Sequence, residues 1–295
     1  MNVGEKIRNL RLEKLMTQAD LAGDQITRNM LCTIERGAAL PSLPTACYIA
    51  ERLNVPVGYL LAEEGDDFAY QKMAAMPNAR HALLAGDHAG CIAILNANLG
   101  DRFDDEIALI RAECEYHIAK EAFDNGRLRA AAAGFDRAIA AAKNTVYNTG
   151  WIRTRAAVYF RYLSSLSPTL ASDILEDGEI EAAKSVGDEF CSYLLAKEAL
   201  DGGRDGEVRD YLARHDGSVF AARLAALSLM RAGSLREALD AYERLLASDD
   251  LTVGVLMYEI FDDMELCCRK NDDYKRAYEF GSSRRGLLER LLEEA

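Results

Sequence analysis

The fold of the N-terminal part is decided by Thr17-Gln-Ala-Asp-Leu-Ala-Gly-Asp-Gln-Ile-Thr-Arg-Asn-Met-Leu-Cys-Thr-Ile-Glu-Arg-Gly37. Thr17 and Asp20 have the spacing of a capping box, in which the hydroxyl and the carboxylate bind amide groups that a helix start leaves unpaired. Gly23 opens a short polar connection, after which Thr27 is placed to cap a second helix. The stretch therefore predicts two short helices joined by a tight turn.

The second of these helices has two different faces. Leu31 and Ile34 are three residues apart and are expected to pack into one core. Arg28, Asn29 and Thr33 project from the other side, where their side chains can hydrogen-bond base edges, arginine being suited to guanine and asparagine to adenine. The alternative for these three residues is an ordinary solvated helix face.

The stretch resembles the phage-repressor-type (Xre/Cro-like) helix-turn-helix. A Thr-Gln pair opens the first helix of that motif and Ile-Glu-x-Gly closes the second, which here are Thr17-Gln18 and Ile34-Glu35-Arg36-Gly37. The resemblance extends from about Val3 to about Leu61. It implies a five-helix, lambda-repressor-like bundle that binds double-stranded DNA.

The resemblance also implies roles for single residues. Gln18 and nearby backbone amides would hold phosphates at the positive end of a helix dipole. Thr27, which begins the second helix, joins Arg28, Asn29 and Thr33 in the predicted DNA-binding set. Arg11 is expected to form an ion pair with Glu35, which would tie the first helix to the reading helix. Two independent surface charges are the alternative.

Two features depart from the family. Leu15-Met16 occupies the connection where a glycine usually takes a left-handed turn, which predicts a different turn or mild strain. The turn between the two motif helices is also one residue shorter than in phage repressors, so the angle of the reading helix and its base contacts do not transfer literally.

The remaining helices of the bundle have their own start and stop signals. A first helix is expected over about Val3 to Lys14, and Ser42 with Pro44 predicts a restart after the motif. Pro56 precedes a short fifth helix. A polar break over residues 63–67 then predicts a linker, with a DNA-binding domain at 1–64 and a second domain at 65–295.

Composition limits what class of protein this is. With 295 residues, 49% of them hydrophobic and 28% charged, two globular domains are expected. The sequence contains no membrane-spanning run and no export signal, which predicts a cytoplasmic protein. The seven cysteines are scattered without C-x-x-C spacing and are expected to be reduced and mostly buried. Neither a metal site nor a cofactor is predicted.

The net charge of −13 is unevenly distributed. Residues 1–63 contain seven Lys/Arg and seven Asp/Glu, so residues 64–295 contain 28 Lys/Arg and 41 Asp/Glu. Attraction of DNA phosphates by the neutral first domain must therefore depend on where its few cations lie. The excess acid of the second domain favours a neutral or cationic ligand.

The second domain is alanine-rich, helical and repetitive. Residues 119–138 and 226–245 share a spacing in which small residues precede a turn glycine and an aromatic residue follows in the next helix. Residues 79–95 follow it loosely, and 274–277 belong to a degenerate copy. The pattern resembles the tetratricopeptide repeat and predicts an α-solenoid with a concave groove. Residues 150–215 fit the period poorly.

The combination of this motif with a repeat array resembles the peptide-pheromone-responsive regulators of the Rgg and PlcR kind, which act in quorum sensing. In those proteins the groove binds a short imported peptide, and asparagines hold its backbone. Six side chains here are predicted to share one helix face for this role: Asn144, Asn148, Trp151, Arg155, Tyr159 and Tyr162. The alternative is a helix that packs its aromatic residues against the next hairpin.

The sequence contains none of the common catalytic motifs, so no catalytic residue and no enzyme activity is predicted. Two functions remain. The first is an all-helical, homodimeric transcription regulator modulated by a short peptide or a protein partner. The second is a protein-interaction scaffold whose N-terminal bundle no longer binds DNA, an alternative kept open by the neutral charge of that bundle.

Overall fold

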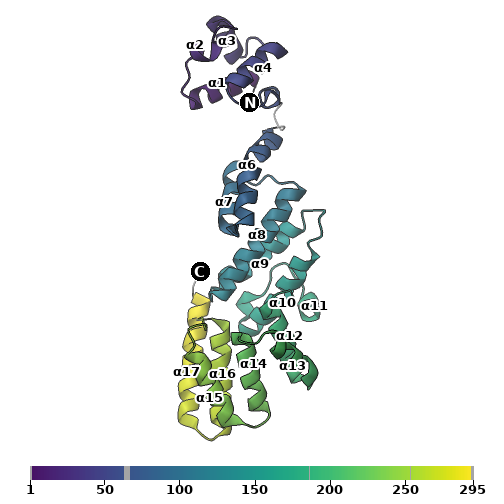
Figure 1. Cartoon of the computed structure of the whole chain (residues 1–295), viewed down its shortest axis with the longest axis vertical. Coiled ribbons are helices and arrows are strands. Elements are labelled where there is room, and N and C mark those ends of the chain that lie inside the picture. Colours follow the sequence, from purple (N-terminus) through teal and green to yellow (C-terminus); the bar gives the residue numbers. More distant parts are fainter. Residues whose placement is uncertain (1, 63–66, 186, 253, 294–295) are drawn as a thin grey trace. The chain divides into compact units, whose positions relative to one another are not determined.

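The computed structural model describes residues 2–62, 67–185, 187–252 and 254–293. Every regular element within these ranges is a helix and none is a strand, which confirms the predicted all-α class. The chain divides into two compact units, Met1–Arg102 and Phe103–Ala295 (Figure 1). The expected linker lies almost wholly outside the described residues, so the boundary at 64 and 65 stays a prediction.

The first unit begins with the expected five-helix bundle. Its helices are α1 (Val3–Glu13), α2 (Gln18–Ala22), α3 (Arg28–Glu35), α4 (Leu43–Arg52) and α5 (Val57–Leu61). All three predicted side-chain caps are present: Thr17 accepts the Asp20 N–H, Thr27 that of Met30 and Ser42 that of Thr45. These local bonds fix where the helices start, because each satisfies an amide that the helix itself leaves unpaired.

One apolar core holds the five helices together. Its fully buried side chains come from every helix: Ile7, Leu21, Leu31, Ile34, Ile49 and Leu60. Leu31 and Ile34 thus occupy the inner face of α3, as their spacing predicts. The Lys6 ammonium, also buried, donates to the Ala62 carbonyl at 2.8 Å and so ties α1 to the end of α5.

Leu15 stands where the resembled family has glycine, and it adopts the left-handed conformation with φ of 55°. The Met16 N–H closes the turn by donating to the Arg11 carbonyl. The Leu15 side chain is 92% exposed, so packing does not compensate for the backbone strain. The strain expected from the missing glycine is therefore present.

A helical hairpin completes the first unit. It consists of α6 (Asp67–Leu84) and α7 (His88–Leu99), which correspond to the loosely matching copy at residues 79–95. The Tyr70 ring of α6 packs edge-on against Tyr59 of α5, with centroids 5.8 Å apart.

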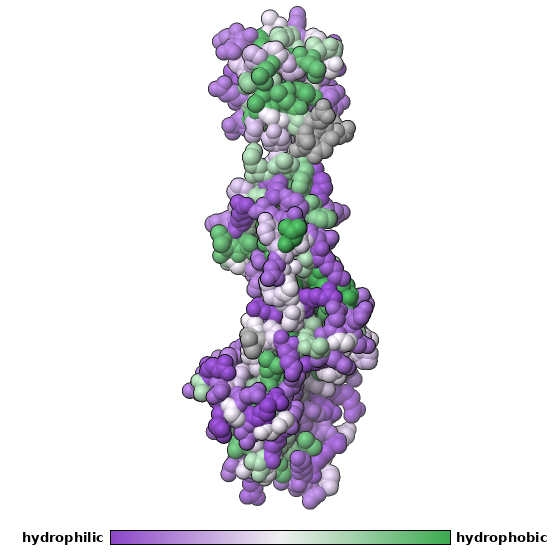
Figure 2. Space-filling model, turned by 90° about the vertical axis from the view of Figure 1, so that its right-hand side faces the viewer, coloured by the Kyte–Doolittle hydropathy of each residue, from purple (hydrophilic) through white to green (hydrophobic). Residues whose placement is uncertain are grey.

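The second unit is an array of hairpins. The first two are α8 (Asp105–Asp124) with α9 (Leu128–Ala142), then α10 (Gly150–Leu166) followed by the 3₁₀ turn η1 (Pro168–Leu170) and α11 (Asp177–Ala182). The next are α12 (Glu189–Asp201) with α13 (Asp205–Arg214), α14 (Val219–Arg231) with α15 (Leu235–Leu246), and α16 (Val255–Lys270) with α17 (Tyr274–Glu293). On the face drawn in Figure 2, hydrophilic residues cover most of this array and apolar ones form small patches.

Several hairpins share one turn, in which a glycine has positive φ. In the turns at Gly126, Gly203 and Gly233 the glycine N–H bonds the carbonyl three residues back, and the next N–H bonds the carbonyl five residues back. Asp272 takes the same conformation between α16 and α17. The turn at Gly203 lies in the segment that fits the sequence period poorly, so one regular copy was missed there.

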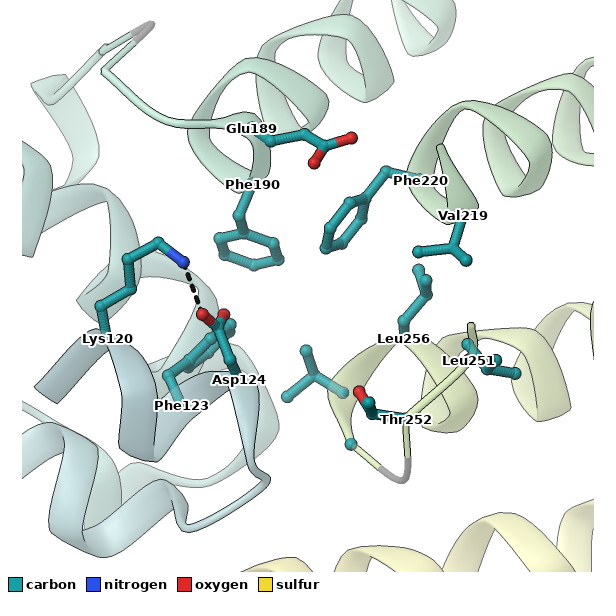
Figure 3. A pocket seen from close by; sticks show the side chains of 12 residues that line it. Lys120, Phe123, Asp124, Glu189, Phe190, Val219, Phe220, Leu251, Thr252 and Leu256 are labelled. Carbon is teal, nitrogen blue, oxygen red and sulfur yellow. Dashed lines mark hydrogen bonds and ion pairs between the residues drawn. The ribbon is translucent and has the colours of Figure 1, made fainter. Parts of the chain in front are cut away.

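The array curves until its two ends meet. Helix α17 packs against α9, and a Cβ atom on Gly254 would lie 3.7 Å from the Asp124 carbonyl oxygen at the end of α8. The first turns of α12, α14 and α16 are brought close to the C-terminal end of α8, as Figure 3 shows.

Candidate DNA-binding face and ligand pocket

A buried ion pair holds helix α3. The Arg11 Nε donates to Glu35 Oε1 at 2.6 Å and its Nη2 to Glu35 Oε2 at 3.1 Å. Gln18 Nε2 adds a bond to Glu35 Oε2 at 2.8 Å. Burial alone would raise the pKa of Glu35, but the bonds from Arg11 and Gln18 outweigh it and lower that pKa. The predicted pair is therefore present, and it links α1, α2 and α3.

Helix α3 also carries exposed polar side chains. Arg28 and Asn29 are exposed, and neither side chain forms a hydrogen bond or ion pair with any described residue. Thr33 is exposed as well, but its hydroxyl donates to the Asn29 carbonyl oxygen at 2.8 Å. The Thr27 hydroxyl accepts the Met30 N–H as a cap. Arg28 and Asn29 thus keep all their donors for an external partner.

The side chain of Gln18 does two things at once. One amide hydrogen binds Glu35, which fixes the carboxamide at the start of α2. The second hydrogen and the carbonyl oxygen remain for another partner. Met30 of α3 is exposed as well, to 41%, and was not predicted from the sequence to be part of this face.

The six side chains predicted for peptide binding do not share one helix face. Asn144 and Asn148 lie between α9 and α10, where Asn144 donates to the Ala140 carbonyl and Asn148 accepts the Gly150 N–H. The expectation of a single face is therefore wrong, because α10 begins only at Gly150. Both asparagines are exposed.

The other four predicted residues belong to α10. The Arg155 guanidinium lies 4.7 Å from the centroid of the half-buried Trp151 ring. Tyr159 and Tyr162 are buried, with 0% and 7% exposure, so their rings pack in the core as the alternative interpretation states. Tyr159 stacks on Phe190, with centroids 5.3 Å apart.

Asp188 organises the start of α12 next to these rings. It accepts the hydroxyls of Tyr116 and Tyr159, both at 3.0 Å, and caps the Cys191 N–H at 2.8 Å. Burial, followed by the charge of Asp188, raises the pKa of both tyrosines, so they stay neutral donors. This network fixes the direction in which Phe190 points.

A pocket of about 220 Å³ lies beside Phe190 (Figure 3). Its walls come from the end of α8, the first turns of α12 and α14, and the loop and first turn that open α16. The apolar lining consists of Phe123, Phe190, Val219, Phe220, Leu251, Val255 and Leu256. Its volume is below the roughly 300–1,000 Å³ of sites for drug-sized ligands, so it fits one or two side chains of a larger ligand.

The pocket was not predicted from the sequence, although the sequence contains one signal for it. Asp188-Glu-Phe190 and Ser218-Val-Phe220 both place a phenylalanine two residues after a helix cap. The two rings meet with centroids 5.9 Å apart. A repeated phenylalanine in the first turn of successive helices is expected to line one site once the hairpins stack.

A second buried network joins the three helices whose first turns line the pocket. Arg223 of α14 is 2% exposed, and it contacts Glu259 and Asp263 of α16, each at 2.6 Å. Tyr193 of α12 donates to the same Glu259 at 2.8 Å, and Lys197 pairs with it. Burial raises the pKa of Asp263 although Arg223 opposes that rise. The network fixes the relative positions of α12, α14 and α16.

Comparisons with known proteins give structural likenesses only. No protein-family model and no curated protein matches the chain. Bacillus thuringiensis PlcR in complex with the peptide PapR7 and DNA is 16% identical, covers 99% of both chains and has a TM-score of 0.26. ComR from S. thermophilus in complex with DNA and its signalling peptide ComS is 12% identical, covers 97% of this chain and 99% of that one, and has a TM-score of 0.25. ComR from Streptococcus vestibularis with its signalling peptide XIP is 14% identical over 97% and 98%, with a TM-score of 0.27.

Two features are absent from the part of the chain that the structure describes. No helix there has the length and apolar character needed to span a membrane. No group of three or more His, Cys, Asp or Glu side chains there is arranged to hold a metal ion.

Proposed function

We propose that this chain is a cytoplasmic, sequence-specific DNA-binding transcription regulator. The single observation that carries the proposal is the open face of α3, where Arg28 and Asn29 have no partner among the described residues. The Arg11–Glu35 ion pair and the bond from Gln18 to Glu35 fix the C-terminal end of α3 against α1 and α2. A rigid helix with unsatisfied polar side chains on one face is suited to reading base edges in the major groove.

Each side chain then has a separate task. Arg28 donates to the acceptors of guanine, and Asn29 bonds the donor and acceptor of adenine. Gln18 and the backbone amides at the start of α2 position the domain on phosphates. Since residues 1–63 carry no net charge, few phosphate contacts are available to each domain. We propose a homodimer, because paired half-sites double the number of contacts.

The array binds a short peptide or a segment of a protein partner in this proposal. The pocket beside Phe190 anchors one ligand side chain. Four side chains predicted from the sequence remain candidates for further contacts: Asn144, Asn148, Trp151 and Arg155. Because the pocket is built from four different helices, a ligand can fit one arrangement of the hairpins better than another. Binding then shifts the conformational equilibrium towards the better-fitting arrangement, by no more than the difference in the ligand's affinity for the two.

Selection of DNA from a random duplex pool by the full chain tests the proposal. We expect one enriched motif, arranged as two half-sites if the protein is a homodimer, and loss of enrichment in the Arg28→Ala variant. Arg129→Ala, which removes an exposed cation from α9, is the matched control and should keep the motif. An absence of any enriched motif at low salt would instead favour the scaffold alternative.

A further inference from the structure

The mouth of the pocket beside Phe190 carries an unbalanced negative charge. Glu189 is the first residue of α12, it is exposed, and its carboxylate lies near the rings of Phe190 and Phe220 (Figure 3). It forms no hydrogen bond or ion pair with the described residues. The other charged residues of the lining, Lys120 and Asp124, pair with each other. One negative charge therefore remains without a partner at this opening.

The same opening presents aromatic surface. Phe220 is only half-buried, and its ring lies at a steep angle to that of Phe190, with an interplanar angle of 61°. A cation is attracted to the face of a phenyl ring and to a carboxylate. An anion would be repelled by Glu189 and by the negative faces of the rings. The opening thus combines two features that select positive charge.

The surface beyond Glu189 is acidic as well. Glu189 also lines a second pocket between α12 and α13, together with Asp210 and with Glu207, which pairs with Arg204. Arg214 and His215 belong to this second pocket, but the formal charge of its lining is still negative with the histidine neutral. A ligand that leaves the apolar pocket past Glu189 therefore enters a region of negative potential.

We infer that the ligand places one large apolar side chain in the pocket beside Phe190 and a cationic group against Glu189. This inference rests on the proposed ligand binding and names the chemistry of its ligand. The cation is an ammonium or guanidinium group, supplied either by a lysine or arginine next to the apolar residue or by the free N-terminus of a peptide. The pocket supplies the apolar contact, and Glu189 selects the charge.

The alternative is that Glu189 serves only to stabilise helix α12. A glutamate in the first turn of a helix stabilises the helix through its dipole. Glu237 has that role in α15, where it is exposed, lies in the first turn and does not line the pocket. Glu237→Gln is therefore the matched control, because it removes the same charge from the first turn of another helix.

A library of immobilised hexapeptides randomised at every position, made with free and with acetylated N-termini, is the probe. The full-length protein should enrich peptides with an aromatic or large aliphatic residue beside a positive charge. Glu189→Gln should keep the apolar preference and lose the preference for the cation, with binding of the best peptide roughly three- to fivefold weaker at low salt. Enrichment that disappears on acetylation assigns the cation to the N-terminus, and enrichment that survives assigns it to a side chain.

Any of the following outcomes would overturn the inference. If Glu189→Gln enriches the same basic peptides as the parent, or Glu237→Gln loses them equally, Glu189 does not select the cation, although peptide binding itself stands. If Val219→Trp, which fills the pocket, leaves the affinity of those peptides unchanged, they bind elsewhere. If the parent protein enriches no peptide, the proposed binding of a peptide ligand fails together with this inference. Circular dichroism on each variant checks that the fold is retained.

Discussion

Replacing Arg223 by methionine tests whether its buried network holds the array together. The substitution keeps much of the side-chain volume but leaves Asp263 buried without the cation that it contacts at 2.6 Å. Glu259 keeps Lys197 and Tyr193 as partners, so most of the cost falls on Asp263. Removing one partner of a buried ion pair lowers the free energy of unfolding by about 3–5 kcal/mol. We expect a loss of about 3 kcal/mol, because only one of the two carboxylates is left without a partner cation.

The expected loss can be converted to a melting temperature. About 3 kcal/mol corresponds to a decrease of roughly 6–12 °C for a unit of this size. Scanning calorimetry of the full chain measures the decrease in the transition of the array. Arg231→Met is the control, because it removes an arginine of the same helix that forms an exposed pair with Asp201. It should lower the free energy of unfolding of the array by no more than about 1 kcal/mol.

The pH dependence and a second substitution separate charge from packing. The pKa of Asp263 is already raised above its ordinary value of 3.8 by burial, and loss of Arg223 should raise it further. The folded variant then binds a proton at Asp263 more tightly than the unfolded variant does. The loss of stability relative to the parent should therefore grow as pH rises from about 4 and shrink as pH falls. Adding Asp263→Asn should recover most of the loss at neutral pH. A double variant no more stable than Arg223→Met would refute this reasoning.

Three other substitutions have expected effects on stability. Leu15→Gly should stabilise the first unit by about 0.5–1 kcal/mol, since it relieves a left-handed leucine whose exposed side chain packs little; an unchanged denaturation midpoint would contradict this. Gly203→Ala should destabilise the array by about 1 kcal/mol at φ of 69°, whereas Gly206→Ala, inside α13, should not; equal effects would show that the turn is not the cause. Glu35→Gln should cost the first unit about 3 kcal/mol at neutral pH by leaving Arg11 unpaired. Because the pKa of Glu35 is lowered from 4.5, that difference should disappear as pH falls below this value, and a difference independent of pH would argue against the ion pair.

Features that depend on neighbouring residues could be predicted from the sequence. Thr17 and Thr27 cap helices through bonds to residues three positions away, and Leu31 with Ile34 faces the core because of helical spacing. The ion pair of Arg11 and Glu35 was predictable only through the resemblance to a family, since nothing local connects these residues.

Features that depend on how hairpins stack could not be predicted in this way. Arg223 is separated by 36 residues from Glu259 and by 40 from Asp263, and no spacing rule joins them. The pocket collects residues from Lys120 to Leu256, so it exists only once the array has curved. The repeat copy at Gly203 could have been recognised from the sequence. Its turn glycine and the buried Val208 five residues later have the same spacing as in the other copies.

The most direct test of the central claim is the base preference of the Asn29→Ala variant. Fluorescence anisotropy would measure the affinity of the parent and the variant for the selected site and for each single base-pair change in it. We predict that the variant loses roughly 1–3 kcal/mol on the selected site and loses discrimination at one base position per half-site, while the other positions keep theirs. Discrimination unchanged at every position, or an equal loss on all sequences, would contradict the claim that α3 reads the DNA.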